Sequence, residues 1–498
     1  MKPWAWVGCG AVCVVLACER TPRVEQVGTT GDAGVTVAAD AGQGPDAGPL
    51  PDAGPPPFGG PGPWPLENRT YGAADGLLES PVVGSSTDAA QNLWVVTHEA
   101  LYLLRPGDAR FQRFAAADGL HLPGNPAWYD DSSLGGGDRS PRIAGEAAPP
   151  GILSVAGGAA GEVFVGYAGV EEDSCEACTG DWADPYRHSG KLDRVRLRAD
   201  GTLDVTRMDL VANAHGAQYW HNRTVYRLLY DHMIHPGELY VGTNHGVTLL
   251  RPDLYREPLP GEWFDTVNQE WMADHLHARV CHHAPCTAGT ENQRMGEWRG
   301  LALSADGLLW TAGRWTAGAI RWEADLVRWY MRPGDEAFAY AFGDPYPQPP
   351  SSSGFVNEPV FRVPQEGDAV NLTAVAVAPD GRAWFASGPS YGTGVDAVAY
   401  GIASWDGLAF TPVDPAVLGA PERVVRDLVA LPDGRLAVAF PQSGVLLWHP
   451  DTGATTWLRA GAGLPDDRVL RLELDDRVTP AALRVSTAAG LAVLRKLP

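Results

Sequence analysis

Two cysteine pairs have a spacing that suits metal or redox chemistry: Cys175-x-x-Cys178 and Cys281-HHAP-Cys286. Thiolates and imidazoles at such distances can ligate zinc. A zinc site usually repeats the Cys-x-x-Cys element, however, and the second pair does not. A covalent haem site would need a histidine directly after Cys178, where Thr179 stands. We therefore expect disulfides, with metal binding as the alternative. Four cysteines allow three pairings, and the pairing stays open.

Histidines gather in the same part of the chain, next to Tyr219, Asp274 and two tryptophans. Such side chains can ligate a metal or act as general bases. Loop histidines without a defined spacing are more often polar surface, and no Gly-x-Ser-x-Gly, phosphate-loop or His-Glu-x-x-His motif is present. We predict no catalytic residue and no cofactor, with a divalent cation as the alternative. The side chains are candidates for a binding face: His215, Trp220, His221, Trp263, His275, His277, His282 and His283.

The start of the chain has the pattern of an export signal. Lys2 precedes an apolar run from Trp4 to Ala17 that is too short to span a bilayer as a stable helix. The run ends in Val-Leu-Ala-Cys18, which resembles the lipobox of bacterial lipoproteins and implies cleavage before Cys18 and acylation of that cysteine. The alternative is a plain secretory signal. We expect residues 1–17 to be a signal peptide and the chain to be lipid-anchored in the bacterial cell envelope, at the outer membrane. No other stretch approaches the roughly 20 apolar residues of a membrane span.

Residues 18–65 are rich in Asp, Ala, Gly and Pro and repeat the tripeptide Asp-Ala-Gly. Such a segment has too little apolar surface to offset its ordering entropy, so we expect a disordered tether. As a coil it would reach roughly 35–40 Å. The cysteines at 9 and 13 leave with the signal and Cys18 carries the lipid. The even number that remains in an exported protein favours disulfides.

The formal net charge of the chain is −22. So acidic a protein is a poor candidate for nucleic acid or for an anionic membrane surface. We therefore expect contact with the membrane through the lipid alone and no nucleic-acid partner.

One pattern recurs along residues 66–498: a turn, a strand with an aromatic or apolar centre, small residues, and a second strand. It reads QNLWVVTHEALYLLRP in its first copy and GELYVGTNHGVTLLRP in its third. Asp-Gly pairs mark hairpin turns before several copies, and helical periodicity is nearly absent. The repeat predicts an all-β, seven-bladed β-propeller of four-stranded antiparallel blades. The centres of the copies are Trp94, Phe164, Tyr240, Trp310, Trp384, Ala437 and Arg484.

The chain ends in a sequence typical of the third strand of a blade, LAVLRKLP. The segment NRTYGAADGL at 68–77 has the pattern of a fourth strand and the exit from a blade. We therefore predict that this N-terminal strand completes the last blade and closes the ring, which would remove two exposed sheet edges.

The copies, together with FAAADGL at 114–120 and WLRAGAGL at 457–464, resemble the periplasmic sensor repeats of bacterial two-component regulators. The resemblance covers nearly all of residues 66–498. It implies the propeller fold and is weak for any activity. No membrane helix or output domain follows in this chain, so direct signalling across the membrane is not expected.

The long insertions are predicted to lie on one face. In a four-stranded blade, connections after the second and fourth strands emerge on one face and the others on the opposite face. By this rule, 122–150, 170–190, 211–222, much of 252–297, 333–371 and 389–399 all fall on the same face. Long loops on a rigid scaffold are where recognition usually resides, so this is the predicted binding face; neutral expansion of surface loops is the alternative.

Arginines recur near the predicted starts of first strands, which line the central channel of a propeller. A ring of guanidinium groups there would suit a carboxylate or a sugar acid. The alternative is pairing with acidic residues of neighbouring repeats. These arginines are Arg223, Arg299, Arg423 and Arg468.

The sequence thus predicts a monomeric, non-enzymatic binding or scaffold module that holds a protein, peptide or glycan through its long-loop face. The alternative is a propeller lyase or hydrolase with a metal and histidines at the channel mouth. Convergence of three or more of the His, Asp and Glu side chains there would favour the enzyme.

Overall fold

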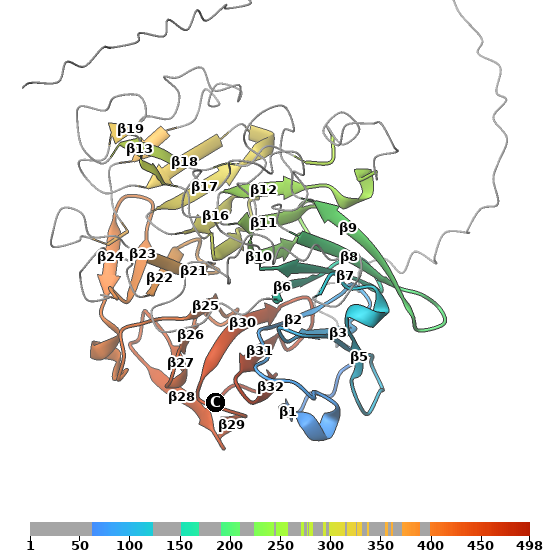
Figure 1. Cartoon of the computed structure of the whole chain (residues 1–498). Helices are drawn as coiled ribbons and strands as arrows, with labels where there is room; N and C mark the ends of the chain where they lie inside the picture. The colour runs from blue at the N-terminus through green and yellow to red at the C-terminus, as the bar shows by residue number, and fades with distance from the viewer. Residues whose placement is uncertain are drawn as a thin grey trace, which may run out of the picture. The chain divides into compact units, whose positions relative to one another are not determined.

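Every copy of the repeated pattern forms a β-strand that is the second strand of its sheet (Figure 1). All residues of these seven strands are buried, which is why their sequences are runs of β-branched, aromatic and small side chains. The seven second strands are β3 (Leu93–Val96), β7 (Glu162–Tyr167), β11 (Leu239–Thr243), β16 (Leu309–Ala312), β22 (Ala383–Gly388), β26 (Leu436–Phe440) and β31 (Ala482–Thr487).

The computed structural model describes part of residues 53–498, which form one compact unit. The predicted signal peptide and almost all of the predicted tether lie outside the described residues. The described residues are 62–122, 151–168, 191–209, 224–243, 246–256, 270–272, 276, 278–281, 292–294, 298–313, 316–324, 326–330, 336–337, 354–356, 360–361, 371–388 and 399–498.

Each second strand lies between a first and a third strand, and both pairings are antiparallel. The first strands are β2 (Gly84–Thr87), β6 (Ile152–Gly157), β10 (Val225–Tyr230), β15 (Gly300–Leu303), β21 (Asn371–Val377), β25 (Asp427–Ala430) and β30 (Val469–Asp475). The third strands are β4 (Leu101–Leu104), β8 (Lys191–Leu197), β12 (Val247–Leu250), β17 (Ala317–Arg321), β23 (Ile402–Trp405), β27 (Gly444–Trp448) and β32 (Gly490–Leu494).

A fourth strand completes six of these sheets in the described part of the chain. The fourth strands are β5 (Gln112–Phe114), β9 (Leu203–Asp209), β18 (Leu326–Tyr330), β24 (Phe410–Val413), β28 (Thr455–Ala460) and β1 (Arg69–Tyr71). In blade three, two isolated bridges, Val247 to Leu276 and Leu250 to Met272, occupy that position. The predicted seven-bladed, all-β propeller is confirmed. Blades four and six each carry one further short parallel strand, β20 (Gly354–Val356) and β29 (Gly463–Leu464).

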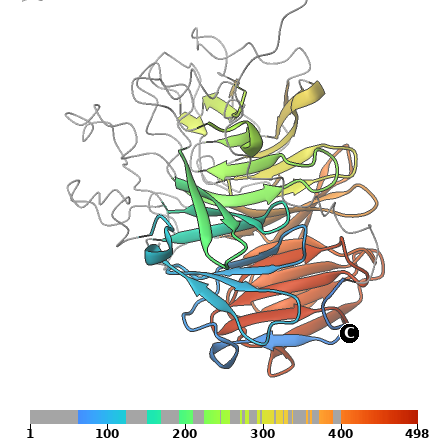
Figure 2. The same ribbon diagram turned by 90° about the vertical axis from the view of Figure 1, so that its right-hand side faces the viewer.

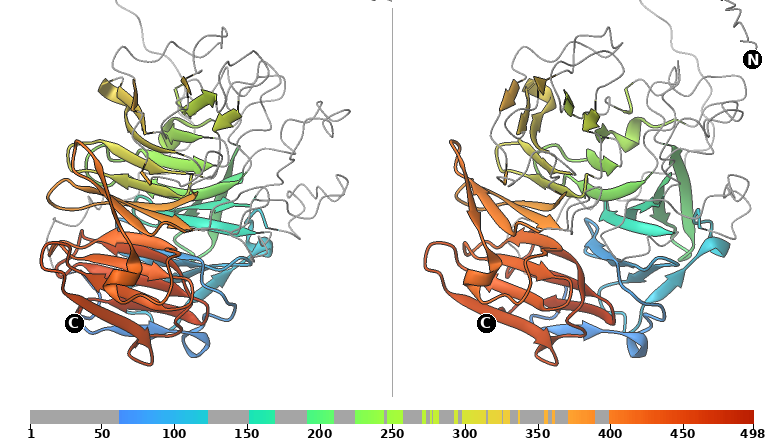
Figure 3. Two further views of the ribbon diagram at one scale, coloured as in Figure 1. Left: turned by 90° about the vertical axis from the view of Figure 1, so that its left-hand side faces the viewer. Right: turned by 60° about the vertical axis from the view of Figure 1, so that its left-hand side comes forward.

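The blades follow one another in chain order around a central axis. Each first strand lies beside the first strand of the next blade, and β30 of the last blade lies beside β2 of the first. Figure 2 and Figure 3 show the blue first blade and the red last blade next to each other. The innermost positions are therefore first strands from all seven blades, and side chains on them face a shared channel.

The N-terminal strand β1 pairs with β32, so that Arg69, Thr70 and Tyr71 oppose Val493, Ala492 and Leu491. The predicted pairing of these two segments is thus observed. Closure of the ring by β1 concerns the stability of the propeller, and it stays a prediction.

The exit from β1 has the same structure as the exit from β5, as their shared sequence predicts. Each leads into a short 3₁₀ turn, Ala73–Asp75 or Ala116–Asp118, in which the Asp accepts a hydrogen bond from the backbone N–H three residues before it. Gly76 and Gly119 follow with φ of 98° and 99°, a left-handed conformation that glycine adopts without a steric penalty. The shared turn shows that β1 occupies the place of a fourth strand.

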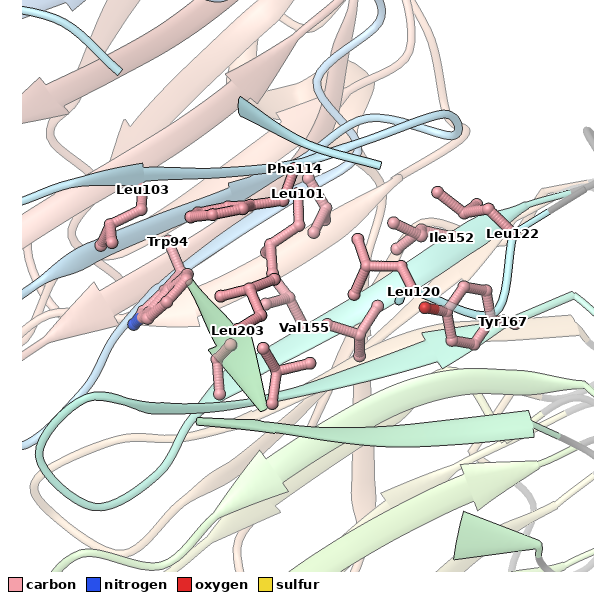
Figure 4. Close-up of a cluster of buried hydrophobic side chains, with 14 of the residues drawn as sticks. Trp94, Leu101, Leu103, Phe114, Leu120, Leu122, Ile152, Val155, Tyr167 and Leu203 are labelled. Carbon is pink, nitrogen blue, oxygen red and sulfur yellow. The ribbon is translucent and has the colours of Figure 1, made fainter. Parts of the chain in front are cut away.

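The core lies between adjacent blades. Figure 4 shows Trp94, Leu101 and Phe114 of blade one packed toward Val155 and Leu203 of blade two. Between blades the first strands are also tied by hydroxyl groups. Ser154 Oγ donates to the carbonyl of Val225 (2.9 Å), and Thr373 Oγ1 donates to that of Val425 (2.7 Å). These two buried hydroxyl groups are thereby paired with the next blade, which helps to fix the register between blades.

Candidate functional site

Most of the predicted binding-face residues lie outside the described residues. These are His215, Trp220, His221, Arg223, Trp263, His275, His277, His282, His283, Cys175, Cys178 and Cys286. Cys281 ends the short strand β13 (Ala278–Cys281), for which only the backbone is described. The predicted disulfides and the alternative metal site therefore stay predictions.

The strand bounds show where the insertions leave the propeller. The connections 115–151, 168–190, 210–224, 277–299, 331–370 and 389–401 all follow second or fourth strands and leave at one face. We call this the insertion face. The connections after first strands are short and form the opposite face, which we call the short-turn face. There Gly307, Gly381 and Gly434 follow Asp at φ of 84–87°, as the Asp-Gly hairpins predict.

One prediction about this face is wrong for part of its residues. Much of 252–297 was expected to lie before the first strand of blade four, and this position holds only for 277–297. The bridges of Val247 with Leu276 and of Leu250 with Met272 place 272–276 at the outer edge of blade three. Residues 251–271 therefore join a third strand to a fourth, and they leave at the short-turn face. The backbone N–H of Arg251 donates to the carbonyl of Trp271 (2.7 Å), which brings the two ends of this connection together.

Two insertions from different connections share a small sheet. β13 pairs antiparallel with β14 (Asn292–Arg294) and with β19 (Glu336–Ala337). The first two strands belong to the connection before blade four, and β19 to the connection after it. Backbone hydrogen bonding thus links insertions on the two sides of blade four (Figure 1).

Oppositely charged side chains meet across the channel. Arg227 of β10 donates from Nη1 to Asp427 Oδ2 of β25 at 3.0 Å, so blade three is joined to blade six. Asp427 is 1% exposed. Its Oδ2 also accepts the N–H of Leu472 in blade seven (2.9 Å), and its Oδ1 accepts the N–H of Leu428 (3.0 Å). One buried carboxylate therefore connects three blades.

Further arginines surround this pair. Arg471 of β30 donates from Nη2 to the carbonyl of Tyr226 (3.2 Å), and the Arg299 guanidinium lies 4.4 Å from the centre of the Tyr226 ring. Burial, together with the like charges of Arg227 and Arg299, lowers the pKa of Arg471, and Asp427 opposes this effect. Three guanidinium groups are thus concentrated in the channel.

The role of the predicted arginine ring in ligand binding stays a prediction, but the structure places three of its four members. Arg299 belongs to the channel group, whereas Arg423 and Arg468 do not. Arg423 pairs with Asp414 (2.7 Å) and Arg468 with Asp466 (3.4 Å), within their own connections and with more than half of each arginine side chain exposed. The channel arginines 227 and 471 lie further along the first strands than the residues that the sequence suggested.

A cavity of about 880 Å³ lies on the short-turn side of these charges. Aliphatic residues of the first strands form much of its wall, for example Leu229, Leu303 and Val429. Its charged side chains include Glu473, Arg477 and Arg484 of blade seven. The volume is within the range of small-molecule sites, so the channel itself can hold a ligand at the face opposite to the insertions.

Two carboxylates of β30 have shifted pKa values: Glu473, which lines the cavity, and Asp475, which lies next to its wall. Burial alone would raise the pKa of Asp475, but Arg484, Arg477 and a hydrogen bond from Thr87 outweigh it and hold that pKa well below its usual range. Burial raises the pKa of Glu473, against the opposing effect of Arg484 and Arg227. The two carboxylates are two residues apart on one strand, and their pKa values shift in opposite directions because Asp475 also accepts hydrogen bonds from Arg477 and Thr87.

His232 lines the same cavity, with its ring 4.7 Å from that of Tyr230. Burial lowers the pKa of His232 to about 3, and the charges of Arg477 and Arg484 act in the same direction against Asp475. The folded protein therefore keeps this imidazole neutral at physiological pH.

Acid should destabilise the protein through His232. Below pH 6.5 the unfolded chain binds a proton at this residue, and the folded protein does not until about pH 3. The stability that depends on the neutral ring is complete above pH 6.5 and is lost as the pH falls toward 3. We expect His232→Gln to reduce the loss of unfolding free energy between pH 7 and pH 4 by about 1–3 kcal/mol, measured by urea unfolding. His449→Gln, outside the cavity, is the matched control. Identical pH profiles for wild type and His232→Gln would contradict this prediction.

The described part of the chain contains no group of three His, Cys, Asp or Glu side chains arranged to hold a metal. What the channel offers is arginines, carboxylates and hydroxyls on a rigid wall. These groups can bind a polar or charged ligand by hydrogen bonds and ion pairs.

The sequence matches no known protein family, and no curated protein matches it. Solved structures with a similar fold include the extracellular domain of the hybrid two-component system BT3049 from B. thetaiotaomicron, with 11% identity and a TM-score of 0.47 over 87% of this chain. This chain covers 42% of that chain, which is less than half of its length. Others are a chain of the mitotic checkpoint complex (12% identity, TM-score 0.42, 93% of this chain and 99% of that one) and YCF48 bound to the D1 peptide (9%, 0.40, 88% and 99%).

At such identities and TM-scores, the function has to be sought in the residues of this chain. None of the helices in the described ranges has the length and apolar character needed to cross a membrane.

Proposed function

We propose that this protein is a lipid-anchored binding module of the bacterial cell envelope, which holds a protein, peptide or glycan on its insertion face without catalysing a reaction. The observation that carries the proposal is the placement of the insertions. Six extended connections leave the blades at one face, and strands of two of them, β13 and β19, pair with each other. Connections of this length on a rigid scaffold are typical of recognition surfaces.

The place where the tether joins the propeller is consistent with an insertion face that points away from the membrane. Gly62, the first described residue, lies against Val478 in the turn 476–481, which joins a first strand to a second. From there the chain runs through β1 toward the insertion face. A lipid on Cys18 would thus attach the protein to the membrane from its short-turn face, and the insertion face would be accessible to a partner.

The net charge of the chain limits the classes of partner that it can bind. With a formal net charge of −22, the protein repels nucleic acid and attracts basic groups. We propose a partner with a basic or neutral surface, a monomeric propeller, and disulfides among Cys175, Cys178, Cys281 and Cys286 that restrain the insertions. Each such bond would contribute a few kcal/mol to the stability of its loop.

The test shortens the insertions and keeps the blades. In one variant, 169–190 is replaced by a Gly-Ser turn, and in another the hairpin at 277–297 is replaced in the same way. The control replaces the turn 449–454, on the short-turn face, by Gly and Ser. Proteins and glycans crosslinked to the wild type in whole cells are identified, and each candidate is then purified and titrated.

We expect a purified partner to lose at least about tenfold in affinity for one or both shortened variants, because about 1.4 kcal/mol of contacts accounts for that factor. The control should bind as the wild type does. Equal affinity of all variants, or a loss confined to the control, would contradict the proposal. Circular dichroism of each variant shows that the propeller is folded.

A further inference from the structure

A second, much smaller cavity lies at the seam between the last blade and the first. Its volume is about 20 Å³, and its walls come from β1, β30, β31 and β32 on one side and from residues 87–93 on the other. Trp64 lies at this wall and donates from its indole N–H to the carbonyl of Gln91 (2.8 Å). The cavity is therefore bounded by the N-terminal segment and by both neighbouring blades.

Two buried arginines line this cavity and have hydrogen-bond donors without acceptors. Arg484 is 3% exposed and Arg495 is 5% exposed. Nε of Arg484 and both Nε and Nη1 of Arg495 are buried and make no hydrogen bond. A buried donor without a partner is costly, and a charged one more so. Three such donors on two neighbouring guanidinium groups require an acceptor.

The carboxylates near the seam are already occupied. Asp475 accepts from Arg477 Nε (3.0 Å), from Gln91 Nε2 (3.2 Å) and from Thr87, and it lies 3.5 Å from Arg484. Glu473 lies 3.5 Å from Arg484 Nη2. Among the described residues, Arg495 forms no ion pair, although the charge of Asp475 acts on it from a distance.

Three guanidinium groups, those of Arg477, Arg484 and Arg495, lie near the carboxylates Asp475 and Glu473, and the charge of Asp476 also acts on Arg477 and Arg484. Of these three arginines, Arg495 has no carboxylate within ion-pair distance among the described residues. The further carboxylate that lines the cavity, Glu67, is exposed to solvent and is screened by it.

Backbone strain is found at the same place. Gln91 has φ of 63°, and it is the one residue other than glycine with positive φ in the described part of the chain. Its side chain is 2% exposed and points to Asp475. Such a conformation persists where the surroundings fix it, and it is found more often at binding sites than elsewhere.

We propose that the seam holds a small monovalent anion of the chloride class, with Arg484 and Arg495 as its donors. An anion there supplies the missing acceptor and places a negative charge beside Arg495. The volume corresponds to about one species of the size of water, which favours a monatomic anion over sulfate or phosphate. The anion joins β31 and β32 to the N-terminal segment, and it therefore stabilises the junction of the last blade with the first. This inference is independent of the proposed function.

A water molecule is the competing occupant, since it could accept from the arginines and also donate to the unpaired Oε1 of Gln91. Water would leave Arg495 without a negative charge in contact with it. The two occupants differ in how stability responds to halide, because a ligand that binds only the folded state stabilises it in proportion to its occupancy.

The experiment measures thermal unfolding of the full chain in sodium chloride, sodium bromide and sodium gluconate at equal ionic strength. We expect a melting temperature about 1–3 °C higher in either halide than in gluconate. Arg495→Met should abolish this difference. The matched control Arg423→Met, at an exposed arginine paired with Asp414, should retain it.

Crystals grown in bromide give a second measurement that does not depend on a variant. An anomalous peak between Arg484 and Arg495 supports the proposal, also if Arg495→Met does not fold. Equal melting temperatures in halide and gluconate, or a seam without an anomalous peak, would mean that water occupies it and would overturn the proposal.

Discussion

Cys18→Ser should move the protein from the membrane fraction to the supernatant of lysed cells. The pattern Val-Leu-Ala-Cys18 predicts acylation at this residue, and each buried methylene of an acyl chain contributes about 0.8 kcal/mol to membrane binding. In the proposed function, a diacylated cysteine would therefore supply most of the membrane affinity. We expect more than about nine-tenths of the variant to be released, since loss of two chains removes several kcal/mol.

Cys13→Ser is the matched control, because it makes the same replacement five positions earlier, within the predicted signal. It should stay in the membrane fraction. Mass spectrometry of the mature N-terminal peptide gives an independent readout: a lipid-bearing Cys18 in the wild type and in Cys13→Ser. Retention of Cys18→Ser in washed membranes would show that another part of the protein binds the membrane, and the interpretation of the lipobox would be wrong.

The fold could be predicted from the sequence because each second strand is buried on both sides. Burial allows only certain side chains there, such as those around Trp94 and Trp384, and the same short pattern therefore recurs in every blade. The Asp-Gly turns fix where each hairpin bends. Even the N-terminal strand was recognisable, since the turn after Tyr71 repeats the turn after Phe114.

The outer edge of blade three could not be predicted in this way. Two isolated bridges, at Met272 and Leu276, are all that defines it, and so short an edge has no alternating pattern that a sequence could display. The rule for the faces was correct, but it was applied to a connection whose fourth strand had not been identified.

The channel site was predicted only as a chemical type. Arginines near the first strands indicated a basic channel, and Arg299 does lie there. The position along a first strand decides whether a side chain reaches the axis, and a shift of three residues separates the exposed Arg468 from the channel residue Arg471. The carboxylate partner, Asp427, is 200 residues from Arg227 in the sequence, and no local pattern connects them.

Asp427→Ala should be among the most destabilising single substitutions in the protein. Its carboxylate is 1% exposed and accepts from Arg227, Leu472 and Leu428 on three blades. Removal of the carboxylate leaves the charge of Arg227 and the N–H groups of Leu472 and Leu428 without this acceptor, and breaking a buried ion pair in this way costs about 3–5 kcal/mol. The midpoint of urea unfolding, followed by tryptophan fluorescence, measures this cost.

Replacement of both Asp427 and Arg227 distinguishes the contribution of the ion pair to stability from the contribution of side-chain packing. In Asp427→Leu with Arg227→Met no charge is left unpaired at this contact, and similar apolar replacements of buried ion pairs are often neutral or stabilising. We expect the double variant to lose less stability than Asp427→Ala alone, with a coupling of about 1–3 kcal/mol between the two sites. The control is Asp433→Ala, where the carboxylate is half exposed and pairs with Arg435 in a surface turn, and its cost should stay under about 1 kcal/mol. If Asp427→Ala costs no more than this control, the channel charges do not hold the blades together, and a role in binding a ligand in the 880 Å³ cavity beside them would then be favoured.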